Sequence, residues 1–203
     1  VLTKIKERLQ DGKAIRGLEM SEDETKIAKN FNFLTLKPII YVGNVSDSDL
    51  ADPMSNPHYK ALSEFAAKEG AECIPVCCEI EAELSKYSKE EKAEFLKSLG
   101  TETSGLDKLV KSAYNLLNLS TFFTVGADEV RAWTFKRGMS APDCAGIIHT
   151  DFKKGFIKAE VYSYDDIMQF KTEVALKEAG KIRVEGKDYI AQDGDIFFFR
   201  FNV

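Results

Sequence analysis

The feature that most restricts the fold of this chain is a short apolar run at residues 38–43, Pro-Ile-Ile-Tyr-Val-Gly. Its side chains are apolar at consecutive positions, so a strand formed here would be buried on both faces, as in a parallel sheet. Asn56-Pro57 then supplies an N-cap and a first-turn proline for a helix that closes near Gly70. A second strand-like run follows at residues 72–77. Strand, helix and strand in this order predict two parallel strands joined by a right-handed crossover.

Two strands alone would leave open sheet edges and little core, so this layer needs more strands than the chain supplies. Further helices are predicted after Ser88, which has Glu91 three residues on, and after Ser104. We therefore interpret residues 34–119 as part of an α/β layer whose missing strands precede Val1. Val1 lies in a helical pattern rather than at an initiator methionine, which favours a fragment, although processing would also explain this start.

The first 33 residues have a helical pattern. Apolar residues recur at helical spacing from Leu2 to Leu9. Ser21, with Glu24 three residues on, has the spacing of a capping box and predicts a second helix that runs to about residue 31. Both helices have polar sides, so residues 1–33 are predicted to form a helical arm.

The character of the sequence changes after Leu119, where short aromatic and β-branched segments alternate with glycine turns. Ser140 precedes Ala141-Pro142, which places a proline early in a helix that runs through Ile148. A hairpin, a helix and returning strands predict a compact α+β domain at residues 120–203. The predicted strands are 120–125, 130–135, 156–161 and 195–201, with a hairpin turn at 126–128.

Composition excludes some functions and leaves others open. The chain is 44% hydrophobic and 30% charged, and no apolar run is long enough to cross a bilayer. The formal net charge of −5 gives no overall attraction to nucleic acid, although a local basic face stays compatible with it. Cys73, Cys77, Cys78 and Cys144 form neither a spaced disulfide framework nor a zinc pattern, which fits a reduced cytosolic setting.

The sequence contains no phosphate-binding G-x-x-x-x-G-K-[ST] motif and no complete catalytic constellation. The two histidines, His58 and His149, lie far apart, and neither has a metal-ligand partner four residues on. We therefore predict no catalytic residue and no metal site in this chain. His149 suits either acid–base chemistry or a turn position satisfied by hydrogen bonds, and we favour the turn.

Polar residues suited to binding a nucleobase follow the first predicted strand. Asn44, Val45 and Asp47 come directly after it, at the carboxyl edge where open α/β sheets place ligands. An asparagine amide both donates and accepts hydrogen bonds, and a carboxylate three residues on accepts from N–H groups of a purine. The alternative is a loop in which Asn44 or Asp47 caps the following turn, and these residues taken alone favour that alternative.

Two pairs of basic residues in the second half are candidate contacts to RNA or the ribosome, Lys136 with Arg137 and Lys153 with Lys154. Acidic and basic residues nearly balance over residues 120–203, so any contact to phosphate must come from such a local cluster. Solvated turns would explain these pairs too, and that alternative is favoured. The pairs support a second class of function, a stand-alone module that binds RNA or the ribosome without nucleotide chemistry.

Several segments resemble one known family. Residues 33–46, Phe-Leu-Thr-Leu-Lys-Pro-Ile-Ile-Tyr-Val-Gly-Asn-Val-Ser, resemble the base-recognition segment of the YchF-type (Obg-like) ATPases. Residues 129–134, 145–152, 154–157 and 185–190, and the ending Phe201-Asn202-Val203, resemble the C-terminal TGS domain of that family. These matches run in the same order along essentially the whole chain, which makes them more specific than any single motif.

The resemblance implies the back part of a cytoplasmic P-loop ATPase that binds the ribosome. The predicted fold class is α/β, an incomplete parallel P-loop-NTPase-type sheet followed by a β-grasp (TGS) α+β domain. In that scheme residues 1–33 are the remnant of a helical arm, 34–119 the C-terminal part of the nucleotide-binding domain, and 120–203 the TGS domain. The family's phosphate loop and magnesium-holding residues precede the region that starts at Val1, so only its base-binding side is carried over.

For the full-length protein the resemblance implies ATP, or alternatively GTP, with Mg²⁺ as cofactors, and the large ribosomal subunit, rather than a membrane, as partner. Asn44 and the backbone of Val45 would hold the base, and the loop around Cys77 would border it. The family usually has Glu where this chain has Asp47, which moves the motif toward the N-x-x-D pattern of GTPases and leaves base preference open. From this chain alone we expect no ATPase activity and no tightly bound cofactor.

Overall fold

The computed structural model describes residues 1–126 and 129–202 of the chain. The chain divides into two compact units, Val1–Leu116 and Leu117–Val203, and each is described by itself. Within the described ranges no helix combines the length and the apolar character that crossing a membrane requires.

The first unit begins with a small helical segment. Its capping box is formed as predicted: the Glu24 N–H donates to Ser21 Oγ at 3.2 Å, and the Ser21 N–H donates to Glu24 Oε2 at 3.0 Å. Ile5, Ile15 and Ala28 form the buried centre of the segment. Its elements are α1 (Leu2–Gln10), the 3₁₀ turn η1 (Ile15–Gly17), α2 (Glu22–Lys29) and the 3₁₀ turn η2 (Leu34–Leu36).

A charged contact ties this helical segment to the rest of the first unit. Arg16 in η1 lies 3.4 Å from Glu69 Oε2, and the hydroxyl of Tyr41 donates to the same oxygen at 2.7 Å. The hydrogen bond from Tyr41, with the nearby Arg16 guanidinium, holds the pKa of Glu69 below its usual value. The helical segment is therefore attached to the rest of the unit through the Glu69 carboxylate, which both Arg16 of η1 and Tyr41 of β1 contact.

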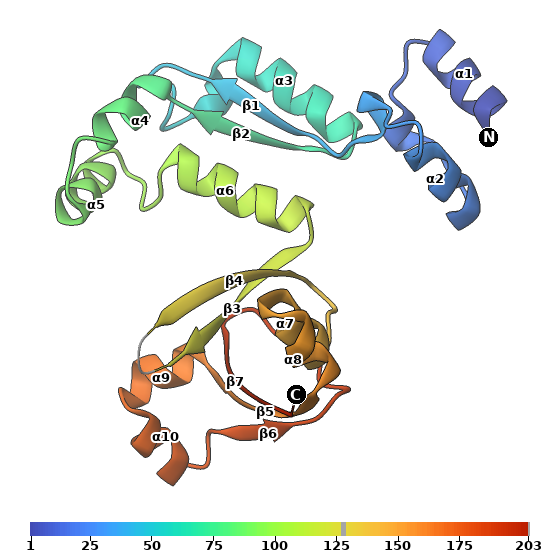
Figure 1. Ribbon diagram of the computed structural model, residues 1–203. Helices are drawn as coiled ribbons and strands as arrows, with labels where there is room; N and C mark the ends of the chain where they lie inside the picture. The colour runs from blue at the N-terminus through green and yellow to red at the C-terminus, as the bar shows by residue number, and fades with distance from the viewer. Residues whose placement is uncertain (127–128, 203) are drawn as a thin grey trace. The chain divides into compact units, whose positions relative to one another are not determined.

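Parallel strands form the centre of the α/β layer, as the sequence predicts. Strand β1 (Ile40–Asn44) pairs with β2 (Glu72–Val76), with Asn44 opposite Val76. The crossover between them contains the 3₁₀ turn η3 (Pro53–Ser55) and α3 (Pro57–Lys68), and Asn56 caps α3 by accepting from His58 and Tyr59 N–H. Figure 1 shows α3 on one side of this pair and α6 on the other. The remaining helices are α4 (Cys78–Leu84), α5 (Lys89–Ser98) and α6 (Gly105–Leu116).

Gly43 allows α3 to approach β1 closely. A Cβ at this position would lie 2.5 Å from Cδ2 of the Tyr59 ring. The Tyr59 side chain is buried, and its hydroxyl donates to the Cys73 carbonyl at 3.3 Å. Any larger residue at position 43 would therefore push the helix away from the strand that carries Asn44.

The second unit is a mixed five-stranded sheet with helices on both faces. The strand order is β4-β3-β7-β5-β6, in which β3 and β7 are parallel and the other neighbours are antiparallel. The predicted hairpin between β3 and β4 is present, although Ala127 and Asp128 of its predicted turn lie outside the described residues. The strands are β3 (Leu119–Val125), β4 (Val130–Lys136), β5 (Phe156–Ser163), β6 (Arg183–Glu185) and β7 (Asp195–Phe201).

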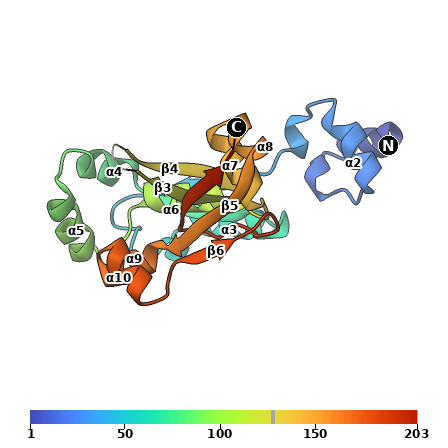
Figure 2. The same ribbon diagram turned by 60° about the horizontal axis from the view of Figure 1, so that its bottom comes forward.

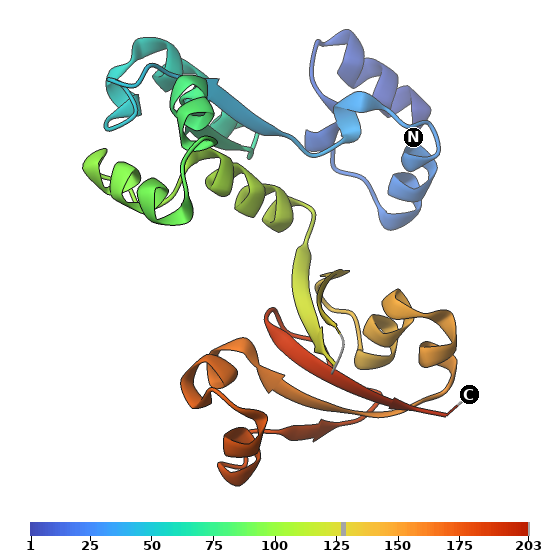
Figure 3. The same ribbon diagram turned by 60° about the vertical axis from the view of Figure 1, so that its left-hand side comes forward.

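Alternation along the strands gives this sheet two different faces. One face packs against α7 (Ala141–Ile148) and α8 (Thr150–Lys154), with Phe122, Phe135 and Phe197 at the centre of the core. The other face packs against α9 (Tyr164–Phe170) and α10 (Glu173–Glu178) through a smaller cluster. Figure 3 shows the two helix pairs on opposite sides of the sheet.

Sequence analysis identified one helix in this unit and missed α8, α9, α10 and β6. These elements are short, from three to seven residues, so none displays enough periods of an apolar pattern to be recognised. Their caps are local side chains, with Ser163 accepting from Asp166 N–H and Thr172 accepting from Ala175 N–H. Packing against the sheet stabilises these helices, which would be too short to persist alone.

The end of the sheet is closed by a tight contact at Gly155. The N–H of Asn202 donates to the Gly155 carbonyl at 2.9 Å, and the Phe201 ring stacks on Phe152 with centroids 3.8 Å apart. Figure 2 shows the end of β7 beside α8. A Cβ at position 155 would overlap the carbonyl of Asn202, which is backbone and has little freedom to move aside.

We predict that Gly155→Ala lowers the free energy of unfolding by about 1–3 kcal/mol, because the new methyl group must displace the Asn202 backbone directly after β7. Urea unfolding followed by circular dichroism measures the change. Gly186→Ala is the matched control, since a Cβ at Gly186 meets no atom within 4 Å. Equal stabilities for the two variants would contradict the prediction.

Candidate functional site

The carboxyl end of β1 presents Asn44 in a defined orientation. The backbone N–H of Cys78 donates to Asn44 Oδ1 at 3.2 Å, which directs the amide nitrogen outward. Nδ2 of Asn44 has no hydrogen-bond partner within residues 1–126 and 129–202, and the residue is exposed. The strand edge therefore offers a hydrogen-bond donor to solvent or to a ligand.

The neighbouring candidate residues are placed differently from one another. Val45 is 7% exposed, and its N–H donates to the Val76 carbonyl at 2.9 Å. The Cys77 side chain is buried among Ile80, Leu84 and Leu96, so only its backbone borders the edge. Cys78, which belongs to the loop that the resemblance placed beside the base, is the residue that orients Asn44. Its position directly after the second predicted strand was the available signal.

Asp47 forms part of a local turn. Its carboxylate Oδ1 accepts from the Ser48 N–H at 2.7 Å, and its carbonyl accepts from the Leu50 N–H at 3.2 Å. The Asp47 side chain therefore contacts only its neighbour in the turn, whereas Asn44 Oδ1 accepts from Cys78, the first residue of α4.

Three of the four basic candidate residues have partners within the second unit. Lys153 lies 2.6 Å from Asp143 Oδ1, and Lys154 lies 3.6 Å from Asp151 Oδ1. Arg137 donates to Ser120 Oγ at 3.0 Å, while Lys136 is exposed at the end of β4. Such pairs on a surface contribute little to stability and can exchange for phosphate, so their role as an RNA contact stays a prediction.

His149 occupies the turn between α7 and α8. The Asp151 N–H donates to His149 Nδ1 at 3.2 Å, so the imidazole caps the N-terminus of α8. The favoured sequence interpretation of a hydrogen-bonded turn histidine describes this geometry. In the described parts of the chain, no three His, Cys, Asp or Glu side chains gather as metal ligands.

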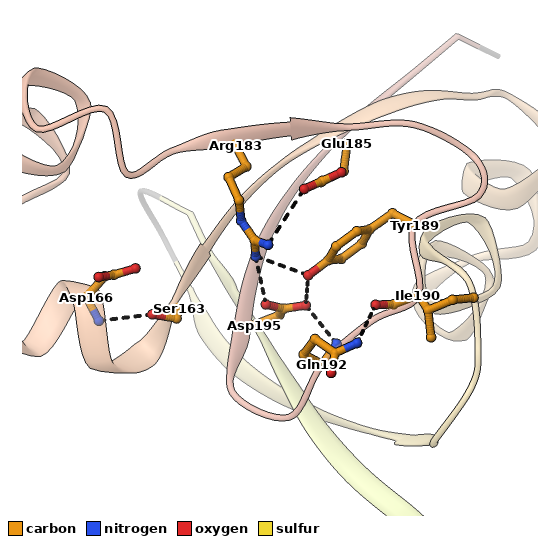
Figure 4. Close-up of polar contacts among 8 residues, drawn as sticks. All are labelled: Ser163, Asp166, Arg183, Glu185, Tyr189, Ile190, Gln192 and Asp195. Carbon is orange, nitrogen blue, oxygen red and sulfur yellow. Dashed lines mark hydrogen bonds and ion pairs between the residues drawn. The ribbon is translucent and has the colours of Figure 1, made fainter.

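A buried carboxylate network in the second unit was missed by sequence analysis. Asp195, at the start of β7, is 2% exposed, and its Oδ2 accepts from the Tyr189 hydroxyl and the Gln192 N–H, both at 2.8 Å. Arg183 on β6 lies 3.5 Å from Asp195 Oδ1 and donates to the Tyr189 hydroxyl at 3.1 Å. Figure 4 shows these side chains converging. The buried charge is thus paired and hydrogen-bonded, as buried charges require.

Burial controls the titration of this region. Burial, with the hydrogen bond to Asp195, raises the pKa of Tyr189 to about 12. Burial likewise raises the pKa of the Cys144 thiol to about 12, so this thiol stays protonated and serves packing rather than redox chemistry. The network and the thiol are structural features of the second unit.

Comparisons with known proteins cover the whole chain. Residues 119–202 match the family model YchF-GTPase_C, described as a protein of unknown function (DUF933). The chain is 51% identical over its full length to a Bacillus subtilis protein named Ribosome-binding ATPase YchF, and 49% identical to the protein of that name from Pasteurella multocida. The resemblance to the YchF family is confirmed.

This chain matches only part of the length of each of these YchF relatives. The chain covers 56% of the Bacillus subtilis protein and 55% of the Pasteurella multocida protein, so it spans about half the length of the curated relatives it matches. The solved structure of the Schizosaccharomyces pombe YchF GTPase is 36% identical, with a TM-score of 0.84 over 98% of this chain and 53% of that chain. The mixed α/β architecture is therefore similar to that of the matching part of this YchF structure.

We predict that Tyr189→Phe lowers the free energy of unfolding by about 1–2 kcal/mol at pH 7, because the buried Asp195 loses a hydrogen-bond donor. The loss should shrink as pH rises from 10 towards 12, since the phenol of the unfolded chain ionises near 10 while the folded hydroxyl keeps its proton to about 12. Urea unfolding at pH 7 and at steps above pH 9.5 measures both effects.

Tyr164→Phe is the control, because Tyr164 is exposed and lies outside the network. This control is expected to change stability by less than about 0.5 kcal/mol. A Tyr189→Phe loss no larger than that of the control would show that the network does not stabilise the fold.

Proposed function

We propose that this chain is the back part of a ribosome-binding P-loop ATPase, in which it supplies the base-binding edge and a C-terminal interaction domain. The observation that carries the proposal is the 51% identity over the full chain to a protein named Ribosome-binding ATPase YchF. A match of that extent includes both units, which supports a role for each of them.

The base-binding role rests on Asn44. Its outward Nδ2 is a donor suited to the acceptor atoms of a purine ring, and its Oδ1 is held by the Cys78 N–H at 3.2 Å. Val45 would add backbone contacts at the same edge. Asp47 Oδ1 accepts from the Ser48 N–H, and Asp47 stays a candidate for contacting the base, so the preference between adenine and guanine is open. ATP and GTP both remain candidate ligands.

The phosphates and Mg²⁺ would be held by parts of the longer protein outside the matched region. The described residues of this chain contain no cluster of carboxylates, histidines or cysteines that fits a metal ion. Hydrolysis is accordingly proposed for the longer protein, and the chain alone is expected to bind a base weakly.

The interaction role rests on the second unit. A hairpin, a helix and a parallel pairing of β3 with β7 in the middle of the sheet support a β-grasp (TGS) domain. We propose that this domain contacts the large ribosomal subunit in the cytoplasm, through protein or RNA. Lys136 with Arg137, and Lys153 with Lys154, are the candidate contacts if RNA is bound.

We predict that adenosine at millimolar concentration shifts the Cys78 backbone amide and the Asn44 side-chain amide in ¹⁵N NMR spectra of this chain. Asn44→Asp keeps an acceptor for the Cys78 N–H but removes the donor, so binding should weaken about tenfold, the equivalent of one lost hydrogen bond. Asn30→Asp, at the exposed end of α2, is the matched control. Unchanged affinity in Asn44→Asp would remove Asn44 from the base site.

We predict that the chain cosediments with purified ribosomes at low salt. If phosphate contacts carry the binding, it should fall steeply between 50 and 200 mM salt, as roughly expected when several phosphates are neutralised. A shallow salt dependence would indicate a protein contact instead. Absence of the chain from the ribosomal pellet at low salt would contradict the proposed interaction role.

A further inference from the structure

Two adjoining cavities mark the face of the second-unit sheet that packs against α9 and α10. The larger has a volume of about 370 Å³ and the smaller about 170 Å³. Val125, Tyr162, Glu173 and Ile196 line both, so the two cavities adjoin, and together they are called the groove. The groove lies on the opposite face from α7 and α8.

The larger cavity is mainly apolar. Phe123, Val125 and Ile196 form its floor on β3 and β7, and Tyr164 and Ile167 form the wall on α9. Val130 at its rim is 70% exposed and Tyr164 is 47% exposed. A volume of this size accepts a large aliphatic or aromatic side chain, and removing such a side chain from water would favour binding.

The junction of the two cavities carries one unmatched carboxylate. Arg200 donates from Nε and Nη2 to Glu160 Oε1 at 3.2 and 3.1 Å and lies over the Phe198 ring, so these charges compensate each other. Glu173 Oε1 accepts from the Tyr162 hydroxyl at 2.7 Å. Among the described residues Glu173 has no cationic partner within 4.0 Å. Lys171 also lines the larger cavity but forms no ion pair with Glu173.

We infer that this groove docks a protein segment that inserts an apolar side chain into the larger cavity and places a Lys or Arg against Glu173. The inference rests on the proposed ribosome association and assigns the contact to a basic ribosomal protein. The lining favours a protein over RNA. The larger cavity is mainly apolar, and the groove as a whole carries Glu160 and Glu173 against Lys171 and Arg200, so it has no positive excess to attract RNA phosphate, while Glu173 offers a contact to a cationic side chain.

The test is cosedimentation of the whole chain with purified ribosomes. Val130→Asp places a charge at the rim of the groove and should weaken binding about tenfold. Val184→Asp is its matched control, because Val184 is another exposed strand valine, 63% exposed, that lines neither cavity. Glu173→Gln removes the charge while its amide oxygen still accepts from Tyr162, and it should weaken binding about threefold to tenfold.

The outcomes separate the docking groove from the proposed function itself. Loss of binding in Val130→Asp and Glu173→Gln, with Val184→Asp within about twofold of the wild type, supports the groove. Wild-type binding that survives both groove variants but is lost in the double variant Lys136→Glu with Lys154→Glu assigns the contact to RNA and overturns the inference. Failure of the unmodified chain to cosediment overturns the proposed ribosome association, and the groove inference with it. Thermal unfolding monitored for each variant confirms that a loss of binding is not a loss of fold.

Discussion

The parallel pairing of β1 with β2 is the constraint on which the first unit depends. With Asn44 opposite Val76, the chain that leaves β2 passes directly beside the end of β1, and the Cys78 N–H reaches Asn44 Oδ1. This pairing requires Gly43, because α3 must lie against β1 for the crossover to close. One backbone register thus positions the helix and selects the end of the asparagine amide that faces outward.

The second unit depends on a pairing that is short but central. Strand β3 pairs with β7 over only two residue pairs, Phe123 with Ile196 and Thr124 with Phe197, yet this joins the hairpin to the remaining strands. Asp193 reinforces the junction by accepting from the Thr121 N–H at 2.8 Å. Asp195 then holds the preceding loop through Tyr189 and Gln192. The same pairing brings together the β3 and β7 residues that form the floor of the groove.

Signals within a few residues of the sequence predicted the helices and strands that short-range interactions stabilise. The Ser21 and Asn56 caps stabilise helices within a few residues of themselves, so they could be recognised without knowledge of any partner. The two parallel strands followed from apolar residues on both faces. The short helices α9 and α10 could not be recognised, because they are stabilised by packing their apolar residues against Tyr162 and Ile196 on the sheet. That contact is not visible in the local sequence. The charge of Asp195 gave no sign of burial, since its partners come from separate positions on β6 and the loop before β7.

The sequence by itself determined the resemblance to the YchF family, the caps, the parallel pair, the four longer C-terminal strands and the position of Asn44 at a strand end, because each depends on neighbouring residues or on order along the chain. Only the tertiary structure decided which atom of Asn44 faces outward, that the Cys77 thiol is buried, and that Lys153 and Lys154 have carboxylate partners. It also decided that Glu173 lies in a groove and forms no ion pair there with another described residue. The physical reason is that orientation, burial and charge pairing depend on contacts between segments that are distant in the chain, and those contacts exist only once the sheets have formed.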